Sequence, residues 1–508
     1  MEYSRREFGK RVGIGALGTS LLAGKGCSAA HEGGGDEMPS GEGTASEYDL
    51  PEGDHEAIRT KMRPIRRRDP RPNVLWIFTD QQQWDLMGCA GNVHAHTPHM
   101  DRLARRGVRF ENTYCPSPVC GPSRGAMVTG RMPHDTQVRH NGDPLSEDTP
   151  TMGEVLREHG YRTWWCGKWH LPEPRLYVDG DVRGFHNMPL PEGLPKPFLG
   201  DNQDMLYAAQ SHDWLVWHAA LWSEPWFHAC SLINPHDICF WPRTNREWAI
   251  GYECEEYEHV DRMPPVPENL GVPNDEPEVL SMRRSRRNRE RSDTAWRAYN
   301  ADYAAMTATV DRAVGMVLEG ARKGGWLENT LIIFTSDHGD GGGSHQWTGK
   351  LSCYEEAAKV PMIVVPPGGL EEGRADGTSL VSGLDIAPTV YDYAGVEAPP
   401  TTYGTSLRGA VEEGGQVARD YVVMHIAPGR RNDPEMGKIE GRMVRSDRYK
   451  YVVFDWGKNP EQLFDLQEDP GELKNLAPDP EYAAVIRRHR EMLGEWKQRT
   501  DDPFEIAR

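Results

Sequence analysis

The sequence predicts an α/β fold: a large mixed, mostly parallel sheet flanked by helices, followed by a small C-terminal antiparallel sheet with a helix. Two continuous apolar runs, Asn73–Asp80 and Thr330–Ser336, are typical of strands that are buried on both faces. Helical and strand-like segments alternate between these runs, as they do around parallel sheets. After Gly395 the segments become short and strand-like, which predicts the second, smaller unit.

The individual elements follow from periodicity and from the residues that end them. Three helices are expected, each with apolar side chains at helical spacing and a glycine directly after it: residues 97–106, 152–159 and 294–323. Two further strands of the larger sheet are expected at residues 161–166 and 226–233. The smaller unit is expected to contain strands 421–425, 443–445 and 449–454 and a helix, 481–497. We therefore divide the body of the chain into residues 73–395 and residues 396–508.

Composition and charge exclude several classes of protein. The chain of 508 residues carries 58 basic and 77 acidic side chains, a net charge of −19, whereas a nucleic-acid-binding protein needs a basic face. It lacks the run of about eighteen apolar residues that a membrane-spanning helix requires. Nine cysteines, an odd number, disfavour a scaffold built from disulfides. We expect neither nucleic-acid binding nor a transmembrane segment, and the oligomeric state is left open.

The N-terminus is laid out as a bacterial export signal. Two adjacent arginines stand in a Ser-Arg-Arg-x-Phe-x-Lys frame, and a short apolar run and an Ala-x-Ala-like end follow them. We expect residues 1–30 to be a twin-arginine signal, which places the protein in the periplasm or outside the cell; the alternative is a basic N-terminus without a role. The export signal could instead end at a lipid-modified Cys27, but Lys25, two residues earlier, fits the pattern of a lipoprotein signal badly. Residues 31–72, rich in Gly, Glu, Pro and Arg, are expected to be a flexible linker.

Two acids fall at the carboxyl ends of the two buried strands. Asp80 ends the first strand and is followed by Gln81, and Asp337 follows the second strand and precedes His338. In parallel sheets the ligand site lies beyond the carboxyl ends of the strands, so these four side chains are expected to lie close together. Oxygen donors with few nitrogens suit Ca²⁺ or Mg²⁺ better than zinc. The alternative is that the acids only cap the strand ends.

A cysteine opens a further predicted helix. Cys120 and Arg124 are four residues apart and share one helix face, and Pro122 suits the first turn. The N-terminus of a helix favours an anion, and a nucleophile beside an arginine fits a site for oxyanion transfer. The alternative is a buried structural cysteine.

More cations and histidines follow other strands of the predicted sheet. Taken singly, each is more often a surface residue than a catalyst, but together they predict one site at the same sheet edge: Lys168, His170, His236 and Lys350.

These residues stand in motifs that resemble one known family. Cys120-Gly121-Pro122-Ser123-Arg124 is followed by Thr129-Gly130-Arg131, then by Gly167-Lys168-Trp169-His170, Ser336-Asp337-His338-Gly339 and the C-terminal Leu463-Phe464-Asp465-Leu466, Asp469-Pro470-Gly471-Glu472 and Asn475-Leu476. In this order, from Asn73 to about Leu476, the chain resembles the type I, formylglycine-dependent sulfatases of the alkaline phosphatase superfamily.

The resemblance implies an alkaline-phosphatase-like fold and a sulfuric ester hydrolase whose substrate is a sulfated saccharide. Cys120 would be oxidised to formylglycine (3-oxoalanine) by a separate formylglycine-generating maturation enzyme. One hydroxyl of the hydrated aldehyde would attack sulfur, and the second would allow the sulfated intermediate to collapse by elimination. Because the twin-arginine route exports folded protein, we expect this oxidation to precede export.

The resemblance also implies a role for each residue. The metal ligands would be Asp80, Gln81, Cys120, Asp337 and His338, holding Ca²⁺ in preference to Mg²⁺. The sulfate would be held by Arg124, Lys168, His236 and Lys350. His170 would act as the base for elimination, and His236 would protonate the leaving oxygen, with Lys350 as a second candidate. Many family members have an acid in place of Gln81 and an asparagine in place of His338, so the identity of the metal stays open.

Two other functions remain open. A phosphonate monoester hydrolase or phosphodiesterase of the same superfamily would share the core motifs. A secreted glycan-binding scaffold without activity would require loss of a key residue, and none is lost. Separately, the arginine-rich segment 281–291 is expected to be either a solvated loop or a docking patch for a sulfated polysaccharide.

Overall fold

The computed structural model describes residues 69–172, 182–188, 200–241, 263–284 and 286–506. The predicted export signal, Cys27 and the predicted linker up to residue 68 lie outside the described residues. Within these ranges, no helix is both long and apolar enough to cross a bilayer.

The core of the fold is a mixed sheet of eight strands. Their spatial order is β4 (His186–Met188), β3 (Arg162–Gly167), β5 (Trp226–Pro235), β1 (Asn73–Asp80), β6 (Thr330–Ser336), β7 (Met362–Val365), β2 (Val108–Tyr114) and β8 (Arg374–Ser382). β7 runs antiparallel to both of its neighbours, and the other five pairs are parallel. The predicted fold class is confirmed.

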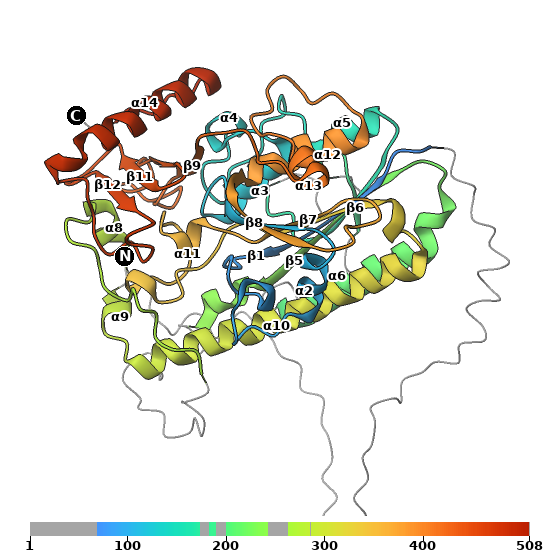
Figure 1. The fold of residues 1–508 in the computed structure, drawn as a ribbon, viewed down its shortest axis with the longest axis horizontal. Coiled ribbons are helices and arrows are strands. Elements are labelled where there is room, and N and C mark those ends of the chain that lie inside the picture. Colours follow the sequence, from blue (N-terminus) through green and yellow to red (C-terminus); the bar gives the residue numbers. More distant parts are fainter. Residues whose placement is uncertain (1–68, 173–181, 189–199, 242–262, 285, 507–508) are drawn as a thin grey trace, which may run out of the picture. The chain divides into compact units, whose positions relative to one another are not determined.

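Helices cover both faces of this sheet (Figure 1). One face carries α2 (Pro98–Ala104), α6 (Gly200–Asp213) and α10 (Asp293–Gly324), and the other carries α3 (Cys120–Thr129), α5 (Met152–Glu158), α12 (Ile386–Ala394) and α13 (Arg408–Glu413). All eight residues of β1 are buried, and alternate side chains serve the two layers: Trp76 packs into the α3 layer, and Ile77 packs into the α10 layer. Burial on both faces explains why this strand is a continuous apolar run.

The C-terminal part forms a second, antiparallel sheet. Its order is β12 (Glu461–Asp465), β11 (Tyr449–Phe454), β10 (Gly441–Arg445) and β9 (Val422–Ile426). Helix α14 (Ala483–Thr500) covers one face through a shared apolar cluster, and the other face packs on residues around α11 (Glu355–Ala358). Through this second contact, the small sheet packs against the segment around α11, which follows β6 in the chain. Further short α-helices in the described part of the chain are α4 (Pro133–Thr136), α8 (Glu278–Arg283) and α9 (Arg286–Arg289).

Candidate active site

Strand pairing brings the predicted residues to one edge of the sheet. β3, β5, β1 and β6 are adjacent and parallel, so their carboxyl ends meet. Asp80 is the last residue of β1, and Asp337 follows β6 directly in a register that pairs Thr79 with Ser336. Lys168 follows β3, and His236 follows β5, whose last two residues are joined by a cis Asn234–Pro235 peptide bond.

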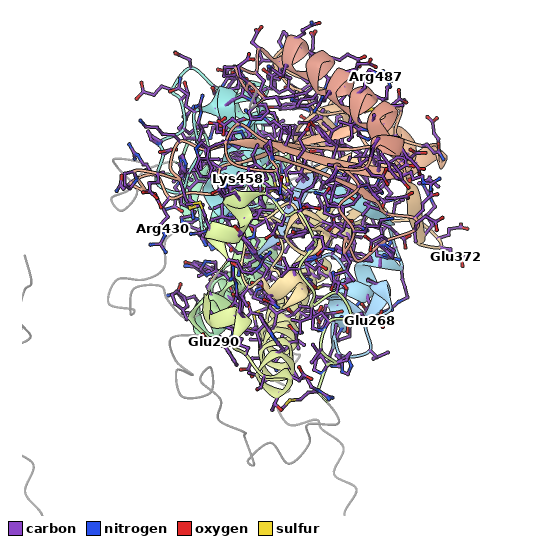
Figure 2. The ribbon with its side chains drawn as sticks, turned by 90° about the vertical axis from the view of Figure 1, so that its left-hand side faces the viewer. Glu268, Glu290, Glu372, Arg430, Lys458 and Arg487 are labelled. Atoms are coloured by element: carbon purple, nitrogen blue, oxygen red, sulfur yellow. The ribbon has the colours of Figure 1, made fainter. Side chains whose placement is uncertain are left out.

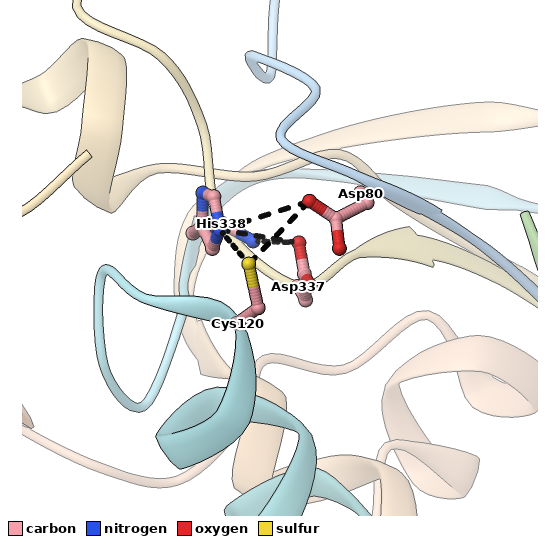
Figure 3. A group of neighbouring side chains, drawn as sticks. All are labelled: Asp80, Cys120, Asp337 and His338. Carbon is pink, nitrogen blue, oxygen red and sulfur yellow. Dashed lines mark hydrogen bonds and ion pairs between the residues drawn. The ribbon is translucent and has the colours of Figure 1, made fainter. Parts of the chain in front are cut away.

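The centre of the site is a group of four buried side chains: Asp80, Cys120, Asp337 and His338 (Figure 3). One ligand atom from each lies within 4.8 Å of the others. Cys120 Sγ lies 3.2 Å from His338 Nε2 and 3.6 Å from Asp80 Oδ1. Two carboxylates and an imidazole that converge on one point in a water-excluded interior can hold a divalent cation. Most charged side chains lie instead at the surface, as Glu268, Arg430 and Arg487 do in Figure 2.

Arg124 links the two acids. Its Nε donates to Asp337 Oδ2 and its Nη2 donates to Asp80 Oδ2, both at 2.8 Å. Its Nη1 donates to the carbonyl of Lys168 at 2.7 Å and to Ser231 Oγ at 2.8 Å. These bonds use four of the five guanidinium N–H groups. The arrangement supports a role in positioning the carboxylates, and binding of the sulfate by Arg124 stays a prediction.

Two lysines place positive charge around the thiol. Lys168 Nζ lies 2.7 Å from Asp80 Oδ2, and Lys350 Nζ lies 2.7 Å from Cys120 Sγ. Burial and the Asp80 carboxylate raise the pKa of the Cys120 thiol, but Lys350, Lys168 and His338 outweigh them and hold that pKa well below its usual value. The site therefore stabilises negative charge at position 120.

Four of the predicted residues keep partial access to solvent, unlike the buried group: Lys168, His170, His236 and Lys350. Burial and the nearby Lys168 lower the pKa of His170, so its imidazole is neutral at neutral pH. Its Nδ1 atom has no hydrogen-bond partner among the described residues. The His236 side chain is 18% exposed, with Nδ1 4.0 Å from Asp237 Oδ1. These four side chains are the ones that a substrate entering the site can reach.

Gln81 has a different environment from its neighbour Asp80. Its backbone lies in the left-handed region (φ 70°), and its N–H donates to Asp337 Oδ1 at 3.1 Å. Its side-chain Nε2 donates to Asp340 Oδ2 at 2.6 Å, and its Oε1 accepts a bond from Cys239 Sγ at 3.1 Å. Asp340 and Cys239 are not among the residues predicted from the sequence. The position of Asp340, immediately after the Ser-Asp-His-Gly motif, was the available signal.

The arginine-rich segment 281–291 contains two arginines that are buried among the described residues. Arg284 is buried and paired with Glu276, and its Nε donates to the carbonyl of His345 at 2.9 Å. Arg291 is also buried and stacks over the rings of Trp241, Trp296 and Tyr299. These two arginines contribute to packing, so the expectation was wrong for them.

Comparisons with known proteins give the family. A family model described as Sulfatase matches residues 72–396, and one described as N-sulphoglucosamine sulphohydrolase, C-terminal, matches residues 343–499. Together with the α/β fold and the site, these matches define the class as a hydrolase of sulfate esters. The chain belongs to the sulfatase family and is a sulfatase.

Individual relatives agree with this assignment. The chain is 32% identical over 456 residues to the Delta 4,5-hexuronate-2-O-sulfatase of Bacteroides thetaiotaomicron, covering 85% of this chain and 90% of that protein. It is 29% identical to the choline-sulfatase of Rhizobium meliloti, covering 81% and 83%. The solved structure of a 2-O GAG sulfatase matches with a TM-score of 0.73 at 30% identity, covering 86% and 95%. A phosphonate monoester hydrolase from Silicibacter pomeroyi, at 23% identity and a TM-score of 0.66 over 85% and 96%, shows the shared fold alone.

Proposed function

We propose that the protein removes sulfate from a sulfated saccharide, with formylglycine made from Cys120 as the nucleophile. The observation that carries the proposal is the placement of Cys120 Sγ between Lys350 Nζ at 2.7 Å and the acids at the two strand ends. The substrate class is supported by relatives whose names specify hexuronate-2-O-sulfate and N-acetylglucosamine-6-O-sulfate as their targets.

The residues present fit a divalent cation. Asp80, Asp337, His338 and the oxygen of Gln81 would hold it, and the predominance of oxygen donors favours Ca²⁺, with Mg²⁺ as the alternative. When bound, such an ion would act as a Lewis acid toward a sulfate oxygen. Burial and the charge of Asp80 raise the pKa of the Asp337 carboxyl, and a cation bound between the two acids would lower it.

The protein's own side chains supply orientation and proton transfer. Oxidation of Cys120 by a formylglycine-generating enzyme would supply, after hydration, two hydroxyls on one carbon, one for attack on sulfur and one for release of sulfate. Lys168 and Lys350 neutralise charge that develops on the sulfate oxygens. The neutral imidazole of His170 can accept the proton released in the elimination step. His236 is partly exposed and would give a proton to the leaving oxygen.

Turnover of matched substrates tests this function. Matured protein, with residue 120 oxidised, is incubated with a panel of defined sulfated disaccharides, an aryl sulfate and an aryl phosphonate monoester, and the released sulfate or phenol is measured. We expect sulfate release, with a saccharide as the preferred substrate. Faster cleavage of the phosphonate would favour the phosphonate hydrolase alternative, and no turnover of any compound would favour the inactive scaffold.

Replacing His236 by alanine tests the proton donor. A sugar hydroxyl is a poor leaving group that needs protonation, whereas an aryl oxide leaves without help. We therefore expect kcat to fall by about 10²-fold on a sulfated saccharide and much less on the aryl sulfate. His94→Ala, at an exposed position outside the proposed catalytic residues, is the control and should leave both rates unchanged. Equal losses on the two substrates would contradict a role for His236 in protonation.

We also propose that the protein leaves the cytoplasm by the twin-arginine route, on the support of the N-terminal motif. Replacing both arginines of that motif by lysine (Arg5→Lys with Arg6→Lys) should retain the protein in the cytoplasm of a host that has this route. Cell fractionation and immunoblotting measure the distribution. Recovery of the unaltered protein from the cytoplasm alone would contradict the proposal.

A further inference from the structure

We propose that Asp340 is a positioning residue for the metal site: it sets the orientation of the Gln81 amide and anchors the loop that carries Lys350. Asp340 is fully buried and its carboxylate accepts four hydrogen bonds. The donors, all within 3.0 Å, are Gln81 Nε2 (2.6 Å), Gly342 N (2.8 Å), Tyr299 Oη (2.9 Å) and Gly349 N (3.0 Å). The inference rests on the proposed function, because it assigns Asp340 a role toward the cation of that site.

The two ends of the Gln81 side-chain amide have different hydrogen-bond partners. A carboxylate can only accept hydrogen bonds, so the NH₂ group of Gln81 must face Asp340, and the amide oxygen must face away from it. The backbone of Gln81 is held separately, since its N–H donates to Asp337 and its carbonyl accepts from the Tyr303 hydroxyl. Asp340 therefore fixes the end of the amide that carries the NH₂ group, and the oxygen on the other side accepts from the Cys239 thiol at 3.1 Å. Only the oxygen can ligate a hard cation.

Asp340 also anchors the glycine-rich loop between Asp337 and Lys350. Asp340 accepts from Gly342 near the beginning of this loop and from Gly349 at its end, so one carboxylate closes the loop on itself. Gly349 adopts φ 75°, a conformation that favours glycine, and it immediately precedes Lys350. Lys350 in turn reaches Cys120 Sγ. The Asp340 carboxylate thus holds the proposed metal ligand Gln81. It also holds the backbone directly before Lys350, whose ammonium group contacts Cys120 Sγ.

Calorimetry of calcium binding tests the role without relying on turnover. Matured protein is stripped of metal with EDTA, dialysed and titrated with CaCl₂. In Asp340→Asn, an amide replaces a pure acceptor and no longer enforces the orientation of Gln81. We expect the Kd for calcium to rise by about 10- to 100-fold, as for other residues that orient metal ligands.

A double-mutant cycle separates positioning from general damage to the fold. If Asp340 acts on the metal through Gln81, Asp340→Asn should change the Kd by less than about twofold in a Gln81→Leu background. Asp385→Asn is the matched control, because Asp385 is equally buried and accepts from two backbone N–H groups and Arg419 away from the site. It should lower Tm but leave the Kd unchanged.

The outcomes are distinct. An unchanged Kd in Asp340→Asn, or an effect of full size in the Gln81→Leu background, would overturn the proposal. If Asp340→Asn does not fold, Tyr299→Phe removes a single donor to the same carboxylate and should raise the Kd in the same direction by a smaller factor; an unchanged Kd there would count against the role of Asp340. An unaltered enzyme that takes up no calcium would overturn the proposed metal site, and this inference with it.

Discussion

Replacement of Cys120 by alanine is expected to reduce sulfate-ester turnover by about 10⁵- to 10⁶-fold, the scale on which covalent enzymes lose activity with their nucleophile. No other side chain can take over, since Cys120 is fully buried at the start of α3 and its neighbours are acids, a histidine and cations already engaged with one another. Steady-state release of sulfate from a sulfated disaccharide measures the effect.

Two further variants test whether the loss of turnover comes from the missing nucleophile. Cys89→Ala removes a half-buried thiol away from the site and should keep full activity. Cys120→Ser retains a single hydroxyl, which can attack sulfur but cannot expel the sulfate, so the protein should gain one SO₃ group by mass and stop. Sustained turnover by Cys120→Ala or by Cys120→Ser would contradict the proposed chemistry.

Replacing Asp80 by asparagine is expected to have the second largest effect. Asp80 is fully buried, pairs with Arg124 and Lys168 and is a proposed metal ligand. Burial raises the pKa of its carboxyl, but Lys168, His236 and Arg124 lower that pKa well below its usual value, so the group is ionised at neutral pH. We expect kcat/KM to fall by about 10³-fold, because a bound metal supplies several kcal/mol of transition-state stabilisation and about 1.4 kcal/mol corresponds to a factor of ten.

The control for Asp80→Asn is another buried acid. Asp311 accepts from the backbone N–H groups of His99 and Met100 at the beginning of α2 and takes no part in the site. Asp311→Asn should lower Tm while the activity of the folded protein persists. Calcium titration of both variants distinguishes them: Asp80→Asn should lose measurable binding. Normal calcium affinity in Asp80→Asn would show that the ion does not bind at this edge of the sheet.

The strands and helices that could be predicted are those whose burial leaves an unambiguous hydrophobic pattern in the sequence. β1 and β6 are buried on both faces, and α10 has one apolar face over its 32 residues, so their periodicity is unambiguous. β8 was not predicted because its first five residues are partly or fully exposed, which removes the pattern. β7 has only four residues, too few to show any period. Its antiparallel pairing with β6 and β2 depends on tertiary contacts that no local pattern carries.

The site could be predicted where strand ends place side chains, and less well where hydrogen bonds decide their orientation. Asp80 and Asp337 follow from the topology of parallel strands. The contacts of Arg124 span 44 and 213 positions of the sequence, so its engagement with both acids could not be read from the motif. The hydrogen bonds of Asp340 likewise depend on how the glycine-rich loop folds back. Long-range hydrogen bonds of this kind leave no signature in sequence spacing.

The most direct test of the account relates turnover to the chemical state of residue 120. Tryptic cleavage releases residues 110–124, which contain both Cys115 and Cys120, so Cys115 serves as an internal standard that should remain a thiol. Samples expressed with increasing amounts of a formylglycine-generating enzyme are analysed by mass spectrometry and assayed on a sulfated disaccharide. We predict that turnover rises in proportion to the fraction oxidised at Cys120 and extrapolates to zero for the thiol. Full activity in protein that retains the Cys120 thiol would contradict the account.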